Sequence, residues 1–210
     1  MKITVIGAGY VGLSISVLLS QRNEVALLEI MPEKVEMLNR KQSPIRDQEI
    51  EEYLADHTLN LTATGDAKAA LAGAEMVVIA TPTNYDAQRS YFDTSSVEVA
   101  IEEAIALAPN APIVIKSTIP VGYTAQVAQQ YKKSDIVFSP EFLREGHALY
   151  DNLYPSRIIS GAAAPQGKAA ALRFGELMRE ASLKETVQVL YMGSTEAEAV
   201  KLFSNTYLAL

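Results

Sequence analysis

The apolar positions of this chain gather in short runs that are rich in β-branched residues. Between the runs, apolar residues recur at the three- and four-residue spacing of amphipathic helices. The clearest runs are "ITVIG" (3–7), "EVALLE" (24–29), "EMVVIAT" (75–81), "PIVIKST" (112–118) and "DIVFSP" (135–140). This alternation is typical of parallel strands connected by crossover helices. The pattern therefore predicts a doubly wound, mostly parallel α/β fold of the Rossmann-like type.

Weaker signals extend this sheet. They are "LNLTA" (59–63), "RIISG" (157–161) and "TVQVLYM" (186–192), with a helix expected over 165–181. Residues 84–93 follow a strand end and form the most polar long stretch, so we expect a loop that faces the ligand crevice of the sheet.

Composition narrows the classes of function. The 210 residues are 49% apolar, carry a formal charge of -7 with a pI near 4.9, and contain no cysteine. One large or two small domains fit this length. The acidic balance argues against nucleic acid or an anionic membrane as partner. The longest apolar runs fall short of the roughly 18 residues of a membrane span, so we expect a cytoplasmic protein. No metal site is expected.

The segment "GAGYVG" follows the first predicted strand and opens a helix that runs to about Gln21. Gly7 permits a tight turn, Gly9 lets backbone amides approach a pyrophosphate, and Gly12 allows close packing of helix on strand. Glu29 ends the second strand, where a carboxylate accepts from the ribose hydroxyls and repels a 2′-phosphate. NAD is therefore favoured over NADP, with Lys34 the one nearby cation. The alternative is a glycine turn that only packs helix against sheet.

Two threonines, Thr83 in "ATPTN" and Thr118 in "IKSTIPVG", follow predicted strands at the edge that faces the cofactor. Each is a candidate for contact with ligand. Helix capping or a turn is the ordinary alternative for a threonine in this position.

Five segments in order resemble the amino-terminal part of the UDP-glucose 6-dehydrogenase family. They are "GAGYVGLS", "ATPTNYD", "IKSTIPVG", "FSPEFLREGHALYDNLYPSRI" and "STEAEAVKLFSNTYLAL". The resemblance implies an NAD-dependent, two-step oxidation of UDP-glucose to UDP-glucuronate through a cysteine thioester, and a homodimer in the full-length form. It implies an NAD-binding domain over 1–193 and the start of a connecting helix over 194–210. Dehydrogenases of UDP-N-acetylmannosamine and GDP-mannose share parts of the pattern.

The resemblance also assigns roles. It implies that NAD is lined by Gly7, Gly9, Tyr10, Val11, Gly12, Glu29, Lys34, Thr83, Thr118 and Glu145. It implies that the sugar nucleotide is lined by Glu141, Phe142, Leu143, Arg144, Glu145, Lys201 and Asn205. The catalytic candidates are Thr118, Glu141, Glu145, Lys201 and Asn205, although the family usually has aspartate where this chain has Glu29.

Glu141 is the candidate general base, because an oxidation that releases protons and then activates water needs a carboxylate near the reacting carbon. The alternative is that Glu141 and Glu145 only begin a helix, where the helix dipole stabilises negative charge. Lys201 and Asn205 lie four residues apart on a predicted helix and would donate hydrogen bonds to the reacting oxygen. That helix is expected to begin with a capping box formed by Thr195 and Glu198. The alternative for Lys201 and Asn205 is a solvated stripe.

Two other classes stay open. A single-step dehydrogenase of the 3-hydroxyacid type shares the glycine motif, and a non-catalytic NAD-binding module would need no cysteine. The chain ends within a helical pattern without a stop signal. This ending suggests a truncated chain, and the resemblance implies that a nucleophilic cysteine and a second nucleotide-binding domain lie beyond Leu210.

Overall fold

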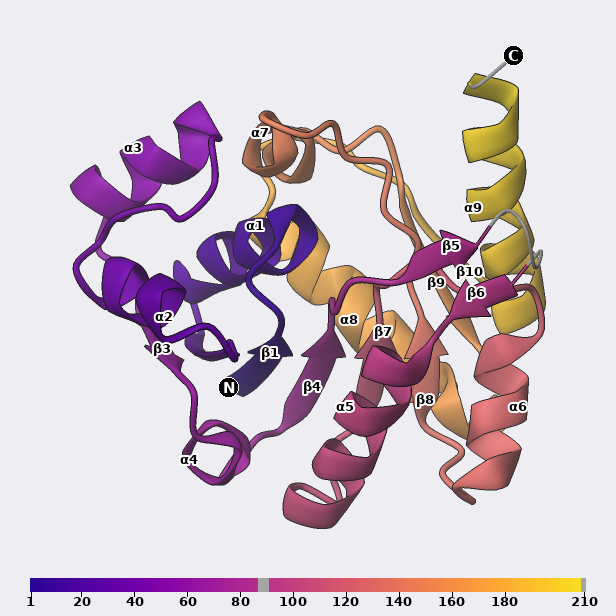
Figure 1. The fold of residues 1–210 in the computed structure, drawn as a ribbon. Helices are drawn as coiled ribbons and strands as arrows, with labels where there is room; N and C mark the ends of the chain where they lie inside the picture. The colour runs from indigo at the N-terminus through magenta and orange to yellow at the C-terminus, as the bar shows by residue number, and fades with distance from the viewer. Residues whose placement is uncertain (87–90, 209–210) are drawn as a thin grey trace.

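The computed structural model describes residues 1–86 and 91–208 (Figure 1). The strands are β1 (Lys2–Ile6), β2 (Glu24–Leu28), β3 (Leu61–Thr64), β4 (Met76–Ile79), β5 (Asn84–Asp86), β6 (Tyr91–Asp93), β7 (Ile113–Ile115), β8 (Ile136–Phe138), β9 (Ile158–Ala162) and β10 (Val189–Gly193). The helices are α1 (Tyr10–Ser20), α2 (Pro32–Asn39), α3 (Gln48–Asp56), α4 (Ala67–Leu71), α5 (Ser95–Leu107), α6 (Tyr123–Gln130), α7 (Ala148–Leu153), α8 (Lys168–Ala181) and α9 (Ser194–Leu208), with a 3-10 turn at Pro165–Gly167.

The main sheet has the strand order β10-β9-β8-β7-β4-β1-β2-β3. All neighbouring pairs are parallel except β8 and β9, whose register pairs Val137 with Ala162 and Phe138 with Gly161. The predicted doubly wound, mostly parallel fold is confirmed, including all three weaker strands. The carboxyl ends of β1, β2, β4, β7 and β8 therefore meet at one edge, where such sheets bind ligands.

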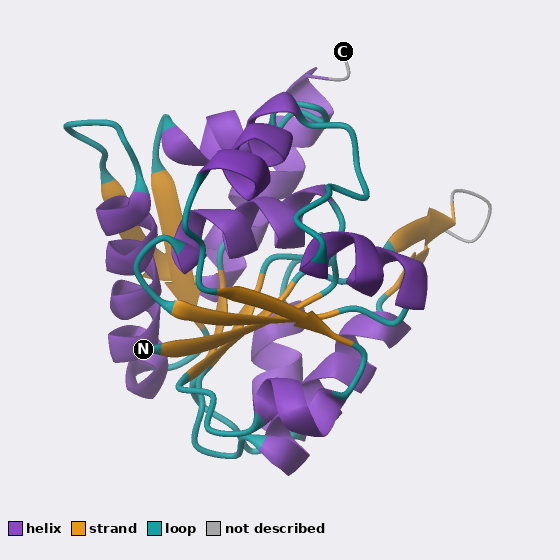
Figure 2. Cartoon of the chain, turned by 90° about the vertical axis from the view of Figure 1, so that its left-hand side faces the viewer, coloured by secondary structure: helices purple, strands orange, loops and turns teal. Residues whose placement is uncertain are grey.

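The stretch expected as a polar loop forms a small antiparallel hairpin of β5 and β6. The hairpin extends from the body of the molecule in Figure 2. Its strands are only three residues each, too short to give an alternating apolar pattern that the sequence analysis could detect. Residues 87–90 of this stretch lie outside the described residues.

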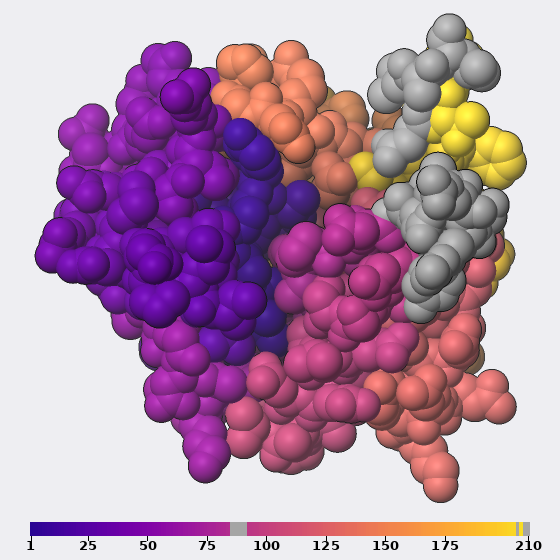
Figure 3. Space-filling view, in the orientation of Figure 1, coloured from indigo at the N-terminus to yellow at the C-terminus, as the bar shows by residue number. Residues whose placement is uncertain are grey.

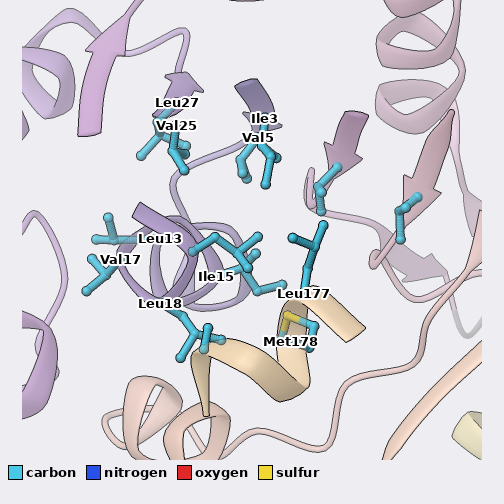
Figure 4. Packing of buried hydrophobic residues seen from close by; sticks show 14 of the residues in the cluster. Ile3, Val5, Leu13, Ile15, Val17, Leu18, Val25, Leu27, Leu177 and Met178 are labelled. Atoms are coloured by element: carbon cyan, nitrogen blue, oxygen red, sulfur yellow. The ribbon is translucent and has the colours of Figure 1, made fainter. Parts of the chain in front are cut away.

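Helices cover both faces of the sheet (Figure 2). One apolar cluster joins the sheet to α1, α3, α7 and α8, and a second joins the opposite face to α4, α5, α6 and α9. Figure 4 shows α1 between the strands and α8, with Leu13, Ile15 and Leu18 among the packed side chains. Each such side chain contributes about 1.5–3 kcal/mol by leaving water. This burial fixes the start of α1 and with it the loop that precedes it.

Helix α9 is anchored by a buried carboxylate. Glu198 is 0% exposed, and its oxygens accept hydrogen bonds from the backbone N–H groups of Gly122 (2.5 Å) and Thr124 (2.8 Å) and from the Thr124 hydroxyl (2.5 Å). These are the orphan donors at the amino terminus of α6, where negative charge is favourable. The expected capping box of Thr195 and Glu198 is therefore wrong, because Glu198 caps a different helix.

We predict that Glu198→Gln lowers the free energy of unfolding by about 1–3 kcal/mol, since its amide group faces donors that need an acceptor. Glu196→Gln is the matched control on the same helix, where the side chain is exposed, and it should change stability by less than about 0.5 kcal/mol. Urea denaturation of the three proteins measures the difference. Equal stabilities would contradict the anchoring role.

Candidate functional site

The loop between β1 and α1 is shaped by its glycines. Gly7 has φ +101°, and a Cβ there would lie 2.7 Å from the carbonyl oxygen of Ala80. A Cβ on Gly12 would lie 1.8 Å from the carbonyl oxygen of Gly7, whereas a Cβ on Gly9 would meet nothing within 4 Å. Gly7 and Gly12 are thus required by packing. Gly9, at the start of α1, faces open space and has no side-chain cap, so the first amides of α1 are accessible to an anionic ligand.

Glu29 is tied to this loop. Its side chain is buried, with Oε2 accepting from the backbone N–H of Ala8 (3.0 Å) and Oε1 from that of Met31 (3.0 Å). The Lys34 ammonium lies 3.9 Å from Oε2. An ionised carboxylate has about four acceptor positions, so Glu29 keeps capacity for hydroxyl donors. Ile30, next in the chain, is 90% exposed and offers an apolar surface beside that carboxylate.

Figure 3 shows how this region lies on the surface. The indigo residues of the amino terminus form a narrow strip between the purple residues on one side and the magenta residues on the other. Tyr10 and Val11 belong to the first turn of α1 and are partly exposed there. The structure thus brings Gly7, Gly9, Tyr10, Val11, Gly12, Glu29 and Lys34 together at one end of the ligand-binding edge.

The two strand-end threonines lie side by side. The Thr83 hydroxyl donates to the carbonyl oxygen of Thr118 (2.8 Å), and the Ser117 hydroxyl donates to the carbonyl oxygen of Thr81 (2.7 Å). These bonds join the loops that follow the neighbouring strands β4 and β7. Helix α6 begins only after its N-cap residue Gly122, so Thr118 does not cap it.

The loop of residues 139–147 follows β8 and holds a close ion pair. Lys201 Nζ lies 2.5 Å from Glu141 Oε1 and also donates to the Glu141 carbonyl oxygen at 2.7 Å. Glu141 Oε2 accepts from the backbone N–H of Leu143 (2.7 Å). Both side chains of the pair are largely buried, at 8% and 14% exposed. The structure thereby brings the Glu141 carboxylate and the Lys201 ammonium into direct contact at the carboxyl end of β8.

The idea that Glu141 and Glu145 begin a helix is wrong, because residues 139–147 are not helical and α7 starts at Ala148. Glu145 is exposed on this loop. Arg144 points to Asp151, with Nη2 to Oδ1 at 2.7 Å and Nε to Oδ2 at 3.1 Å. Arg144 thus braces the loop with its side chain. The Phe142 ring packs inward, under the guanidinium of Arg157 at 4.5 Å from the ring centroid.

Two residues that support this loop were not selected from the sequence. Asp47 caps α3 at the N–H of Ile50 (3.1 Å) and also accepts from the N–H of Ala148 at the start of α7 (2.6 Å). Lys116, directly after β7, donates to the Ser139 hydroxyl (3.3 Å) and to the Pro140 carbonyl (3.2 Å). A cap residue and a charged residue ending a buried strand were visible in the sequence, but their distant partners were not.

Lys116 is the most perturbed cation of the site. It is 6% exposed, and its pKa is lowered from 10.5 to about 8, mainly by burial; the negative charge of Glu141 opposes this shift and the positive charge of Lys201 adds to it. Strongly perturbed groups in a cleft are typical of functional sites. Asn205 lies on α9 one turn beyond Lys201, but its side chain is outside the described part of the structure.

Comparison with known proteins decides the family. The sequence profile of the UDP-glucose/GDP-mannose dehydrogenase family, NAD binding domain, matches residues 1–179. The chain belongs to this family. Its cofactor is NAD, and the glycine loop, Glu29 and the strand-end threonines lie within the matched domain.

Individual relatives agree with this assignment. The chain is 49% identical over 211 residues to UDP-glucose 6-dehydrogenase of Streptococcus pneumoniae, covering 100% of this chain and 54% of that protein. It is 47% identical over 212 residues to the enzyme of the same name from Campylobacter jejuni, covering 100% and 53%. The structure of a UDP-glucose dehydrogenase from Pyrobaculum islandicum, 29% identical, superposes with a TM-score of 0.83 over 99% of this chain and 50% of that chain.

The chain therefore spans about half the length of the curated relatives it matches. The part of the family that it matches is the NAD binding domain, over residues 1–179. Within the described ranges, no helix has the length and apolar character needed to cross a membrane.

The glycine geometry gives a matched pair of variants. Gly12→Ala should lower the free energy of unfolding by about 1–3 kcal/mol, because its methyl group collides with the Gly7 carbonyl. Gly9→Ala should cost less than about 1 kcal/mol but weaken NAD at least about tenfold, since its methyl group occupies the path of the pyrophosphate. Denaturation and calorimetry separate the two effects. A Gly9→Ala protein that binds NAD normally would show that NAD does not approach there.

Proposed function

We propose that this chain is the cofactor-binding half of an enzyme that oxidises the C6 hydroxyl of UDP-glucose to a carboxylate in two NAD-dependent steps, giving UDP-glucuronate. The observation that carries the proposal is the Lys201–Glu141 pair at the ligand-binding edge of an NAD-binding domain. It is supported by identity of 49% and 47%, over the whole chain, to proteins named UDP-glucose 6-dehydrogenase.

The residues present fit NAD. Gly9 leaves the first amides of α1 open for the pyrophosphate, and Glu29 keeps acceptor positions for the adenosine ribose. Thr83 and Thr118 follow β4 and β7, which lie between β1 and β8 in the sheet, so they lie between the glycine loop and residues 139–147. Bound there, NAD supplies the hydride acceptor. The repulsion between Glu29 and a 2′-phosphate favours NAD over NADP.

The substrate lies against residues 141–145 in this proposal. Glu141 is the general base, which takes a proton as the C6 hydroxyl is oxidised and later activates the hydrolytic water. A lysine ammonium has three N–H donors, and Lys201 uses two of them on Glu141. The third is available to an oxygen on which charge develops, where one such donor contributes about 10²–10³ in rate. Asn205 is proposed as the second donor and Glu145 as a contact to both ligands.

Formation of an acid requires a covalent thioester in this reaction scheme, and the 210 residues contain no cysteine. The nucleophile is therefore proposed to lie in the half of the protein that this chain does not cover. The full protein is proposed to be a homodimer. An enzyme of the same class that acts on another nucleotide sugar is the second candidate, since solved relatives include dehydrogenases of GDP-mannose and UDP-N-acetylmannosamine.

The cofactor preference can be tested on the chain itself. NAD should bind at least about tenfold more tightly than NADP in calorimetry, and Glu29→Gln should reduce that ratio because the repelling charge is removed. The ratio of the NAD and NADP affinities reports on the ribose contact, because partial unfolding of a variant would weaken both cofactors equally. Glu33→Gln, which neutralises an exposed carboxylate on the adjacent helix α2, should leave the ratio unchanged. An NAD/NADP ratio near one in the unmodified chain would refute the ribose assignment.

Turnover tests the reaction. With UDP-glucose and NAD, the 210-residue chain should give no sustained NADH absorbance at two per sugar, because it lacks the thiol. In the protein that contains both halves, Glu141→Gln should slow formation of the acid by about 10²–10⁴-fold while NAD affinity is kept. Glu51→Gln, an exposed control, should have no effect. Unchanged acid formation in Glu141→Gln would return Glu141 to a purely structural role.

A further inference from the structure

A cavity lies beneath the loop of residues 139–143, on the face of the sheet covered by α7 and α8. Its volume is about 170 Å³, and its wall includes residues of β9, α7, α8 and the segment 154–157. One water molecule occupies about 10–15 Å³ of cavity volume, so the cavity has room for a small ion together with several waters. The described residues of the cofactor loop are not part of its wall.

Two cations in the wall of the cavity lack a carboxylate partner. The carboxylates of Glu141 and Asp151 face it, but each already has a cation, Lys201 and Arg144 respectively. Lys116 and Arg157 also face it, and neither forms an ion pair with any residue that the structure describes. The wall thus holds two cations and two carboxylates, and the carboxylates are already paired with cations outside the wall, so Lys116 and Arg157 have no ion-pair partner among the described residues.

For Lys116 the lack of a partner is costly. A lysine is rarely buried completely without a carboxylate partner, because removing its charge from water is expensive. Its two hydrogen bonds, to the Ser139 hydroxyl and the Pro140 carbonyl, are long at 3.3 and 3.2 Å. Both acceptors are neutral, and so is the Phe174 ring that lies 5.6 Å away. A negative ion in the adjacent cavity would supply the missing counter-charge.

The geometry points to this cavity as a binding site for a small tetrahedral oxyanion of the phosphate class, held between Lys116 and Arg157. Arg157 lies over the Phe142 ring and Lys116 holds the Pro140 carbonyl, so the occupied site would brace the substrate loop from below. The inference concerns a cavity beside the proposed reaction centre and does not depend on the reaction. In the simpler alternative, Lys116 holds the loop by its two hydrogen bonds and the cavity contains only water.

Titration of the isotopically labelled chain with inorganic phosphate, followed by NMR at constant ionic strength with chloride as balance, tests the site. We expect saturable shifts at residues 139–143 and 156–159. Lys116→Met should weaken phosphate at least about tenfold, because the buried cation is lost. Lys68→Met removes an exposed lysine from the distant helix α4 and should leave the affinity unchanged. Arg157→Gln, at a partly exposed position, gives a second test if Lys116→Met does not fold.

The affinity for sulfate, measured as a function of pH, is a second test. The charge of sulfate is constant over this range, and the simpler alternative predicts no sulfate binding at any pH. Burial lowers the pKa of Lys116 to about 8, so sulfate affinity should fall between pH 7 and 9 as this cation is lost. The other titratable or charged groups facing it are Glu141, Asp151, Tyr154 and Arg157 in the wall and Lys201 from α9.

A parallel titration with UDP distinguishes the source of the oxyanion. Saturation by inorganic phosphate identifies a site for a free ion. Shifts at residues 156–159 with UDP but not with phosphate would identify the phosphates of a nucleotide as the occupant. Absence of saturable shifts with both, or equal affinities in the unmodified chain, Lys116→Met and Arg157→Gln, would overturn the proposal.

Discussion

The contact on which the ligand-binding edge depends is the ion pair between Lys201 and Glu141. It joins a helix near the carboxyl terminus to a loop sixty positions earlier, and it is shielded from water. A shielded pair of this kind is not a source of large stability, because desolvation offsets much of the attraction. Its effect is geometric, since removing either partner leaves a charge without compensation and the loop without its anchor.

Helix α9 carries two such contacts on neighbouring turns. Glu198 accepts from the amino terminus of α6, which follows the Thr118 loop, and Lys201 reaches the loop that follows β8. The loops beyond β7 and β8 are therefore positioned by one rigid element. The two loops share this support, so a displacement of α9 would alter both.

Much of the fold was predictable because it rests on local patterns. The β-branched runs predicted every strand of the main sheet, and the spacing from Gly7 to Gly12 predicted the tight turn between β1 and α1. The partners of polar side chains were not predictable in the same way. Thr195 and Glu198 fit a local capping rule, yet Glu198 serves α6. Lys116 ended a strand without any neighbour in sequence that would reveal its surroundings. Such contacts depend on which loops the strand order of the sheet brings together. The pattern of apolar and polar residues along the chain does not reveal that order.

The single antiparallel pairing in the main sheet has an evolutionary consequence. Because β8 and β9 run in opposite directions, the chain leaves the sheet after Phe138 and re-enters it at Ile158 on the same edge. The segment between them, which contains Glu141 and α7, is a long connection between two strands of the sheet. Substitutions or small insertions within it can reshape recognition without altering strand order. The loop between β1 and α1, which belongs to other strands, would keep its geometry under such changes.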